Sequence, residues 1–498
     1  MLTRGKVVLF YPPYDGAPLG APLALLSLAG TLREANFEVA LIDAAIEPNY
    51  LNRVAEECKS ALCLGISVLT GPMIQGAIDA AKFVKKHAPD VCVVFGGWHP
   101  TLCPESTLHE PYVDVVVRGQ GEITIVELAS ALAKKGPLDL IAGITWKKQG
   151  RLIENFERRV QPVDTFPPPA FDIVDFDAYE RVSGKRELAY ATSIGCPYAC
   201  NYCTDMVVYK RRFNAYSAEH VIKELVDLVV RYRITHVALL DSNFPVDVHR
   251  AIAIAKGIRD SGVKFNWTFQ ASTDFICRMS QDEVQLLADS GVNYMGFGTE
   301  STSPAVLKLM NKRHQRVDEM YETARKGNLA GIRINFNLIL GYPGETSADR
   351  LITFRTMSDI RRKFANVRFS PNIFTPYPGI PIWPQLRELG VVEPKTLEDW
   401  MTMPLGANML PWLRGSELAR LNRTLDYFLL LNQKRSQKAS LLRRLASFIV
   451  RAPIRWRLNA DFFSFPWEIW LARLSEQIVK RRSLITGRRL PVQRANVC

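Results

Sequence analysis

The first 150 residues alternate short apolar runs of the β type with stretches in which apolar residues recur at helical spacing. Five runs predict strands, at residues 6–11, 39–43, 62–68, 91–96 and 113–117. Strands that alternate with helices form parallel sheets, and ligands of such sheets bind beyond the carboxyl ends of the strands. The pattern therefore predicts an α/β fold that begins with a doubly wound, Rossmann-like domain over residues 1–150.

The proline-rich stretch from Phe166 to Pro169 cannot lie inside a helix or sheet, so residues 151–186 are interpreted as a linker. A second alternating series over residues 187–405 contains six strand candidates, which end near Gly195, Asp241, Asp274, Glu300, Gly341 and Pro376. Six strand-helix units predict a partial (β/α)6 barrel of the TIM type, with its chemistry at the carboxyl-terminal rim. After residue 405 the pattern becomes helical, which predicts a helical C-terminal region over residues 406–498.

The C-terminal region carries almost all of the net charge of +13. From Ser416 to Cys498 there are 17 Lys or Arg against 5 Asp or Glu, a net charge of +12, with interleaved Phe462, Phe463, Phe465, Trp467 and Trp470. Basic segments with Trp and Phe suit an anionic membrane surface, and a plain helical cap with a solvated basic face is the alternative. We do not expect nucleic acid as a partner, and the sequence contains no apolar run of about 18 residues that would span a membrane.

The number and setting of the cysteines bear on the cellular compartment. There are nine cysteines, and the first ten residues contain Arg4 and Lys6 but no apolar stretch as long as a signal-peptide core. We therefore expect a cytoplasmic protein with reduced thiols.

Three of the cysteines, Cys196, Cys200 and Cys203, have CxxxCxxC spacing on a loop that follows a strand candidate. Three thiolates can hold three irons of a 4Fe-4S cluster and leave the fourth iron open to a ligand that is not protein. The alternative is buried or zinc-bound cysteines, although a structural zinc site would normally include a fourth Cys or His.

With Tyr202 before the last cysteine, this motif resembles the signature of radical S-adenosylmethionine enzymes. Within that superfamily the chain looks like the cobalamin-binding branch, over approximately residues 5–400. The resemblance implies three cofactors: a 4Fe-4S cluster on the triplet, S-adenosylmethionine at the open iron, and cobalamin on the N-terminal domain.

Several barrel positions match segments of this family. The segment from Gly296 to Ser301 looks like the fourth-strand glutamate motif, which implies that Glu300 lies near S-adenosylmethionine; a solvated strand-end carboxylate is the alternative. The segment around Ser242 and Asn243 is similar to the second-strand segment that contacts the methionine part of the cosubstrate, and Gln270 is a weaker candidate for the same site.

The N-terminal domain contains two loops that resemble the cobalamin site of this branch, formed by Gly96, Gly97, His99 and Thr101, and by Gly119, Gly121 and Glu122. Glycines suit a flat corrin because they allow close approach to the backbone. The family usually has Gly-Glu-Gly-Glu at the second loop, so Gln120 departs from it. A sheet domain that has lost its ligand is the alternative.

One motif of other cobalamin proteins is absent from the chain. The Asp-x-His-x-x-Gly motif supplies a histidine to cobalt in the methionine synthase type, and the nearest match, at Asp247 and His249, lacks the Gly. The resemblance therefore implies cobalamin without a protein histidine on cobalt. We expect His99 to be a hydrogen-bonding group instead.

The resemblance implies that S-adenosylmethionine is cleaved to a 5'-deoxyadenosyl radical, that a substrate radical takes the methyl group of methylcobalamin, and that a second S-adenosylmethionine remethylates cobalt. We expect a methyltransferase acting on an unactivated carbon of a small molecule, with a lipid, hopanoid or tetrapyrrole favoured by the tail. An oxidative cyclase resembling the anaerobic magnesium-protoporphyrin IX monomethyl ester cyclase is the alternative, and a cobalamin or redox sensor is an alternative of another class. The implied protein partner is a reductant such as flavodoxin or ferredoxin.

Overall fold

The computed structural model of the chain describes residues 3–14, 18, 20–402, 410–413, 415–432, 452–457, 460, 462 and 465–470. They form two compact units. Unit 1 is made from residues 1–270, 289–292 and 375–406, and unit 2 from residues 271–288, 293–374 and 407–498.

Unit 1 begins with a seven-stranded sheet in the order β2-β1-β3-β4-β5-β6-β7. Its parallel part is β1 (Lys6–Tyr11), β2 (Glu38–Asp43), β3 (Ala61–Ser67), β4 (Cys92–Gly96) and β5 (Val115–Val117). The sheet continues with the antiparallel strands β6 (Ile144–Lys148) and β7 (Arg151–Glu154), which the apolar pattern does not predict. The predicted doubly wound domain is confirmed, and its strands begin within two residues of the predicted positions.

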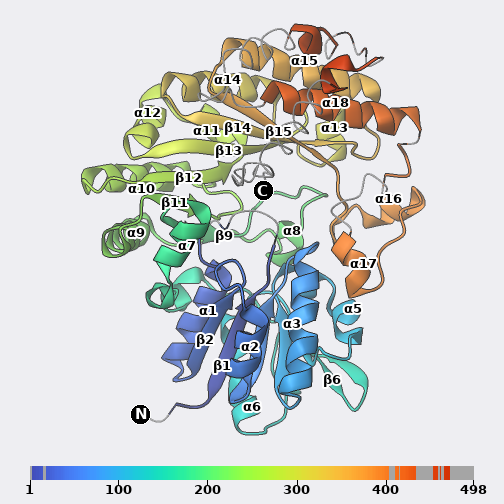
Figure 1. Cartoon of the computed structure of the whole chain (residues 1–498). Helices are drawn as coiled ribbons and strands as arrows, with labels where there is room; N and C mark the ends of the chain where they lie inside the picture. The colour runs from blue at the N-terminus through green and yellow to red at the C-terminus, as the bar shows by residue number, and fades with distance from the viewer. Residues whose placement is uncertain are drawn as a thin grey trace, which may run out of the picture. The chain divides into compact units, whose positions relative to one another are not determined.

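Helices cover both faces of this sheet. On one face α1 (Leu23–Glu34) packs against α6 (Glu122–Ala133), and their apolar residues share a core with alternate residues of the strands, such as Val7 and Leu9. The intervening residues point to the other face, where Phe10 stacks on Tyr50 with 5.4 Å between ring centroids. On that face α2 (Tyr50–Cys58) packs along α3 (Met73–His87), as Figure 1 shows. Short helices follow β4, namely α4 (Trp98–Leu102) and α5 (Pro104–His109).

The rest of unit 1 carries three parallel strands in the order β12-β11-β8, with bounds β8 (Glu187–Tyr190), β11 (His236–Leu239) and β12 (Asn266–Ala271). Helix α9 (Ala218–Tyr232) packs on α10 (Val248–Asp260). The connections contain the antiparallel pair β9 (Ser193–Ile194) and β10 (Asn214–Ala215), and η1 (Val163–Thr165), η2 (Phe171–Ile173), α7 (Phe176–Ser183) and α8 (Asp205–Val208). Residues 375–406 return to this unit with α16 (Trp383–Glu388) and α17 (Leu397–Thr402), and α17 packs on α3.

Unit 2 contains three parallel strands in the order β15-β14-β13, with bounds β13 (Val292–Glu300), β14 (Arg333–Leu340) and β15 (Val367–Ile373). Its helices are α11 (Thr273–Arg278), α12 (Gln281–Asp289), α13 (Pro304–Leu309), α14 (Val317–Leu329), α15 (Ser347–Lys363) and α18 (Ser416–Asn432). The strand-helix units expected of a partial barrel are therefore present, and no closed barrel occurs among the described strands. The third strand candidate ends before its predicted position, because Asp274 lies in α11.

The described part of the C-terminal region is packed on unit 2. Helix α18 contacts β15, and Leu421 and Tyr427 are buried. Trp412 donates its indole N–H to the carbonyl oxygen of Gly341 at 3.0 Å. Among the described residues, no helix is both long and apolar enough to cross a membrane. Phe463 and the basic clusters at residues 443–444 and 480–482 lie outside the described residues.

Candidate functional site

The cysteine loop is shaped by close backbone packing. Gly195 has φ +76°, and a Cβ atom there would lie 2.0 Å from the carbonyl oxygen of Arg212, so only glycine fits. Within the loop, the backbone N–H of Cys203 donates to the carbonyl oxygen of Cys200 at 3.2 Å. Cys200 is buried and Cys196 and Cys203 are half-buried, and none of the three is in a disulfide.

The three thiols stay the predicted ligands of an iron-sulfur cluster. Burial is the main cause that raises the pKa of Cys203 to about 12, against the opposing effect of a hydrogen bond from the backbone N–H of Asp205. Metal binding removes such a proton, because a coordinating thiol is deprotonated outright. Within the described part of the chain, no group of three or more Cys, His, Asp or Glu is arranged to hold one ion. A 4Fe-4S cluster is a larger body that takes one thiolate on each of three irons, which suits three cysteines of one loop.

A buried aspartate, for which the sequence motifs predict no role, fixes the chain just before this loop. Asp241 accepts hydrogen bonds from the backbone N–H and the hydroxyl of Thr192, at 2.9 and 2.6 Å, and from the hydroxyl of Ser193 at 2.5 Å. Burial raises the pKa of Asp241, and its hydrogen bonds oppose that shift. Arg250 adds hydrogen bonds to the carbonyl oxygens of Thr192 and Tyr216, at 2.8 and 2.6 Å.

The three candidate S-adenosylmethionine residues of unit 1 lie at the ends of β11 and β12. Ser242 donates its hydroxyl to Oδ1 of Asp205 at 2.5 Å, and Asn243 is buried. The carbonyl oxygen of Gln270 accepts the backbone N–H of Phe244 at 3.1 Å, which ties the end of β12 to the loop after β11. A contact of these residues with S-adenosylmethionine stays a prediction.

Glu300 belongs to unit 2, where it ends β13 beside an irregularity in the pairing with β14. It has φ +58°, is 8% exposed, and its Oε1 lies 3.8 Å from Nζ of Lys312. A left-handed backbone costs about 1–3 kcal/mol for a residue other than glycine and persists only where the surroundings enforce it. This strain supports a functional role for Glu300, which stays a prediction.

A threonine connects the two candidate cobalamin loops of the N-terminal domain. Thr101 donates its hydroxyl to the carbonyl oxygen of Gly97 at 2.6 Å and accepts the backbone N–H of Gly119 at 3.0 Å. Gly97 follows Gly96 at the end of β4 with φ +92°, and a Cβ atom there would lie 3.0 Å from the backbone nitrogen of Val68. Gly119 is exposed with no atom within 4 Å of a Cβ position, which leaves room for a flat ligand.

The second loop ends where α6 begins. The carboxylate of Glu122 accepts the backbone N–H groups of Gly121 and of Glu122 itself, and burial raises the pKa of this carboxyl. Gln120 accepts the backbone N–H of Gln161 at 2.7 Å and donates to its carbonyl oxygen at 3.4 Å. The residue that departs from the family pattern therefore binds the linker backbone, and a glutamate there could accept but not donate.

His99 is fully buried, and it is covered by Trp400 from residues 375–406, the segment of the chain that returns to unit 1. Its Nδ1 lies 3.1 Å from the hydroxyl of Thr70, and its ring meets Trp400 edge to face at 5.9 Å. Its Nε2 is buried without a hydrogen-bond partner, and burial lowers the pKa of His99 to about 4. Because the ring is enclosed by protein, this geometry supports the prediction that His99 does not bind cobalt.

The cobalamin loop and the cysteine loop are adjacent in unit 1. Trp98 meets Tyr209 edge to face, with 5.9 Å between ring centroids, and α4 packs against α8. The returning segment also reaches the cysteine loop, because the backbone N–H of Ile382 donates to the carbonyl oxygen of Asn201 at 3.2 Å.

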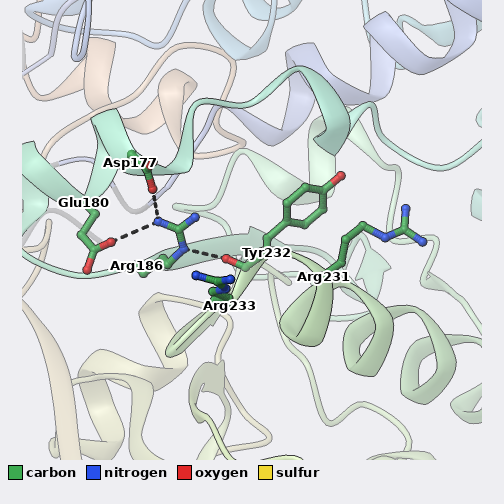
Figure 2. A pocket seen from close by; sticks show the side chains of 6 residues that line it. All are labelled: Asp177, Glu180, Arg186, Arg231, Tyr232 and Arg233. Carbon is green, nitrogen blue, oxygen red and sulfur yellow. Dashed lines mark hydrogen bonds and ion pairs between the residues drawn. The ribbon is translucent and has the colours of Figure 1, made fainter.

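A separate cavity of about 480 Å³ lies beside α7 and the end of α9 (Figure 2). Arg186 pairs there with Asp177 and Glu180 and donates to the carbonyl oxygen of Tyr232 at 2.6 Å. The remaining lining residues are Arg231 and Arg233. No candidate site residue lines this cavity, so we do not assign it to the reaction.

Comparison with known proteins identifies two domain families in the chain. Residues 6–129 match the B12 binding domain family, and residues 190–357 match the radical SAM superfamily. Uncharacterized methyltransferase PH0819 of Pyrococcus horikoshii is 32% identical over 391 residues, which are 76% of this chain and 82% of that protein. The chain belongs to the cobalamin-binding radical S-adenosylmethionine enzymes. Its cofactors are accordingly cobalamin, S-adenosylmethionine and a 4Fe-4S cluster.

Two further comparisons describe this enzyme's relatives. The anaerobic magnesium-protoporphyrin IX monomethyl ester cyclase of Synechocystis sp. is 28% identical over 299 residues, which are 58% of this chain and 59% of the cyclase. The radical S-adenosylmethionine methyltransferase TsrM from Kitasatospora setae, solved with cobalamin and a [4Fe-4S] cluster bound, is 18% identical, with 79% of each chain covered and a TM-score of 0.66. The likeness to TsrM shows a shared fold.

Proposed function

We propose that the enzyme is a cobalamin-dependent methyltransferase that acts on an unactivated carbon of a small molecule. The observation that carries this proposal is the contact of Trp98, in the first cobalamin loop, with Tyr209, at the end of the helix α8 that follows the cysteine loop in unit 1. When bound, the cluster and S-adenosylmethionine supply a 5'-deoxyadenosyl radical, and cobalamin carries the methyl group that a substrate radical takes. Adjacent loops favour this transfer because both reagents must reach one substrate carbon.

The protein's own contribution is to hold these loops rigid. Asp241 and Arg250 fix the backbone before the cysteines through hydrogen bonds to Thr192. Thr101 fixes one glycine loop to the other. Reacting groups positioned in this way need little further ordering when the substrate binds.

Methyl transfer is favoured over oxidative cyclisation by the degree of similarity. PH0819, a methyltransferase by name, is more similar to this chain than the cyclase and matches more of both chains. A cobalamin or redox sensor is disfavoured because Cys196, Cys200 and Cys203 are all present behind a glycine that the loop requires. For the substrate class we propose an apolar lipid, a hopanoid or a tetrapyrrole.

The experiment identifies the substrate and then counts products. Metabolites of a deletion strain are compared with those of the complemented strain, and the compound that lacks a methyl group in the deletion strain is given to the purified enzyme with methyl-deuterated S-adenosylmethionine. We expect a deuterated methyl group in the product, with 5'-deoxyadenosine and S-adenosylhomocysteine in about equal amounts. The Cys200→Ala protein is the matched control without the radical. A product formed with 5'-deoxyadenosine but without S-adenosylhomocysteine would overturn methyl transfer in favour of cyclisation.

We further propose a cytoplasmic location and a reductant such as flavodoxin or ferredoxin as the protein partner. The free cysteines of the described residues agree with a reducing compartment. Reductive cleavage of S-adenosylmethionine also requires an electron from outside the chain. Reconstituted protein incubated with reduced flavodoxin should form 5'-deoxyadenosine. A protein that forms it with the chemical reductant dithionite but not with reduced flavodoxin would argue against flavodoxin as the donor.

We also propose that the C-terminal region attaches the enzyme to the inner face of the membrane. Four of its aromatic side chains are between 46% and 71% exposed: Trp456, Phe462, Phe465 and Trp470. Aromatic rings of this kind lie at headgroup depth, and nearby Lys and Arg contribute roughly 1 kcal/mol per charge on anionic lipid. The alternative, a plain helical cap, is supported by the packing of α18, in which Leu421 and Tyr427 are buried.

Because α18 is packed, a truncation near Leu413 would expose buried residues, and point variants are the sharper test. We compare flotation of wild-type protein with a variant in which the four exposed aromatics are Ser, on vesicles of phosphatidylglycerol and phosphatidylcholine. The control variant replaces Leu140 and Phe156, which are 93% and 90% exposed elsewhere, by Ser. Wild type and control should float, with partial release at 1 M salt, where the Debye length is about 3 Å. Wild-type protein that stays in the soluble fraction at low salt would overturn the membrane proposal.

A further inference from the structure

The aspartate that follows the cysteine triplet, Asp205, contacts both ends of the cysteine loop. It is the first residue of α8 and is 5% exposed. Its carboxylate accepts the backbone N–H of Cys196, the first cysteine, and its own backbone N–H donates to the thiol sulfur of Cys203, the third. The hydroxyl of Ser242, in the loop after β11, donates to Oδ1 of the same carboxylate at 2.5 Å.

These contacts join three points of the chain through one residue, because its carboxylate binds Cys196 and Ser242 and its backbone N–H binds Cys203. Cys196 and Cys203 are seven positions apart, and a cluster requires their sulfurs at fixed positions. The buried carboxylate holds the backbone of Cys196 at the start of α8, where the backbone N–H of Asp205 holds Cys203. Its removal leaves the N–H of Cys196 and the hydroxyl of Ser242 without this acceptor. Oδ2 of Asp205 is buried without a hydrogen-bond partner.

We infer that Asp205 is a positioning residue of the iron-sulfur site, which sets the spacing of Cys196 and Cys203 through hydrogen bonds while Ser242 fixes its orientation. The residue acts through the cysteines and does not touch the reacting atoms. The inference rests on the cluster of the family and is independent of the proposed methyl transfer, because its test measures iron and not product.

The test compares variants of the full-length reconstituted enzyme. Asp205→Ala removes the acceptor, whereas Asp205→Asn keeps a side-chain oxygen of the same reach. Loss of groups that support metal ligands typically costs about 10–100-fold in metal affinity, so the Ala variant should lose its cluster to a chelator about 10–100 times faster than wild type. The Asn variant should return most of the way to the wild-type rate. Ser242→Ala removes one donor and should give a rate between wild type and Asp205→Ala.

Asp43 supplies a matched control at the end of β2. It is 4% exposed and likewise accepts one hydroxyl, from Tyr179 at 2.6 Å, and one backbone N–H, from Ala45 at 2.8 Å. Asp43→Ala therefore removes an equally buried carboxylate without touching the cysteine loop. This variant should keep its iron content and its rate of cluster loss, even where it lowers the melting temperature.

A spectroscopic readout separates positioning from general stability. The electron paramagnetic resonance signal of the reduced cluster should broaden in Asp205→Ala, and its change on addition of S-adenosylmethionine should weaken, at temperatures where circular dichroism shows the protein folded. An Asp205→Ala protein with the wild-type rate of cluster loss and the wild-type signal overturns the inference. So does an Asp205→Asn protein as impaired as Asp205→Ala, because hydrogen-bond acceptance alone would then not account for the effect. A variant that fails to fold leaves the decision to Ser242→Ala, whose wild-type behaviour overturns the inference as well.

Discussion

Substitution of Trp400 by Ala should loosen the cobalamin loop although the two lie far apart in sequence. Trp400 is 1% exposed and meets His99 and Trp383 edge to face, at 5.9 and 6.1 Å. Removal of a fully buried Trp typically costs about 3–5 kcal/mol. Because the indole covers His99, we expect part of that loss to appear as local opening of the loop after β4.

The size of the local effect follows from this loss. If about 3 kcal/mol falls on the loop, opening becomes about 100 times more frequent, since 1.4 kcal/mol is a tenfold change. Two amides report it, namely those of Thr101 and Cys103, which donate to the carbonyl oxygens of Gly97 and His99 at 3.2 and 2.9 Å. Hydrogen exchange of the peptide over residues 97–103, measured by mass spectrometry, should accelerate accordingly.

The control is the same substitution at an exposed indole. Trp456 is 59% exposed, so Trp456→Ala should change stability by less than about 0.5 kcal/mol and leave this peptide unchanged. The reasoning is refuted if Trp400→Ala lowers the melting temperature while the peptide over residues 97–103 exchanges at the wild-type rate. In that case Trp400 would stabilise α17 without supporting the loop.

Three further predictions concern the cofactors and the pH dependence of stability. Replacement of any one triplet cysteine by Ala should abolish both cluster retention, measured by iron analysis, and 5'-deoxyadenosine formation, measured by chromatography. Single replacement of any other cysteine should leave both unchanged; these are Cys58, Cys63, Cys92, Cys103, Cys277 and Cys498. Protein loaded with cob(II)alamin should show no superhyperfine splitting from a protein nitrogen, and axial nitrogen coupling that disappears in His99→Ala would contradict the assignment of His99. Burial raises the pKa of Glu345 to about 7. As pH rises from about 4.5 to about 7, the unfolded chain releases the Glu345 proton while the folded protein still holds it. Wild type should therefore lose up to about 3 kcal/mol of stability relative to Glu345→Gln. Denaturant titrations at several pH values measure this difference.

Local patterns in the sequence were enough to predict the strands that carry the two cofactor loops. Continuous apolar runs marked β1 to β5, and the cysteine spacing marked the loop that follows β8. Both signals depend on neighbours within about ten residues, so they survive without knowledge of the tertiary fold. The hairpin β6–β7 was missed because its strands, with Lys147, Lys148 and Arg151, lack a buried apolar run.

The parts of the site that sequence could not predict depend on contacts between distant segments. Asp205 is a single acid after a motif, and its role appears only when Ser242 is brought to it. Likewise, His99 could be assigned a hydrogen-bonding role from its loop, but its enclosure by Trp400 requires the return of residues 375–402 to unit 1. Gln120 looked like a departure at a ligand contact, whereas its amide binds the backbone of Gln161.

The return of residues 375–402 to unit 1 also sets an order of events during synthesis. Trp400 leaves the ribosome roughly 300 residues after His99, which at about 5–20 residues per second is a delay of about 15–60 s. Throughout that interval the nascent N-terminal sheet has an open imidazole where the finished enzyme has a covered one. A fragment that ends at residue 150 would therefore lack the indole that covers His99 in the complete enzyme.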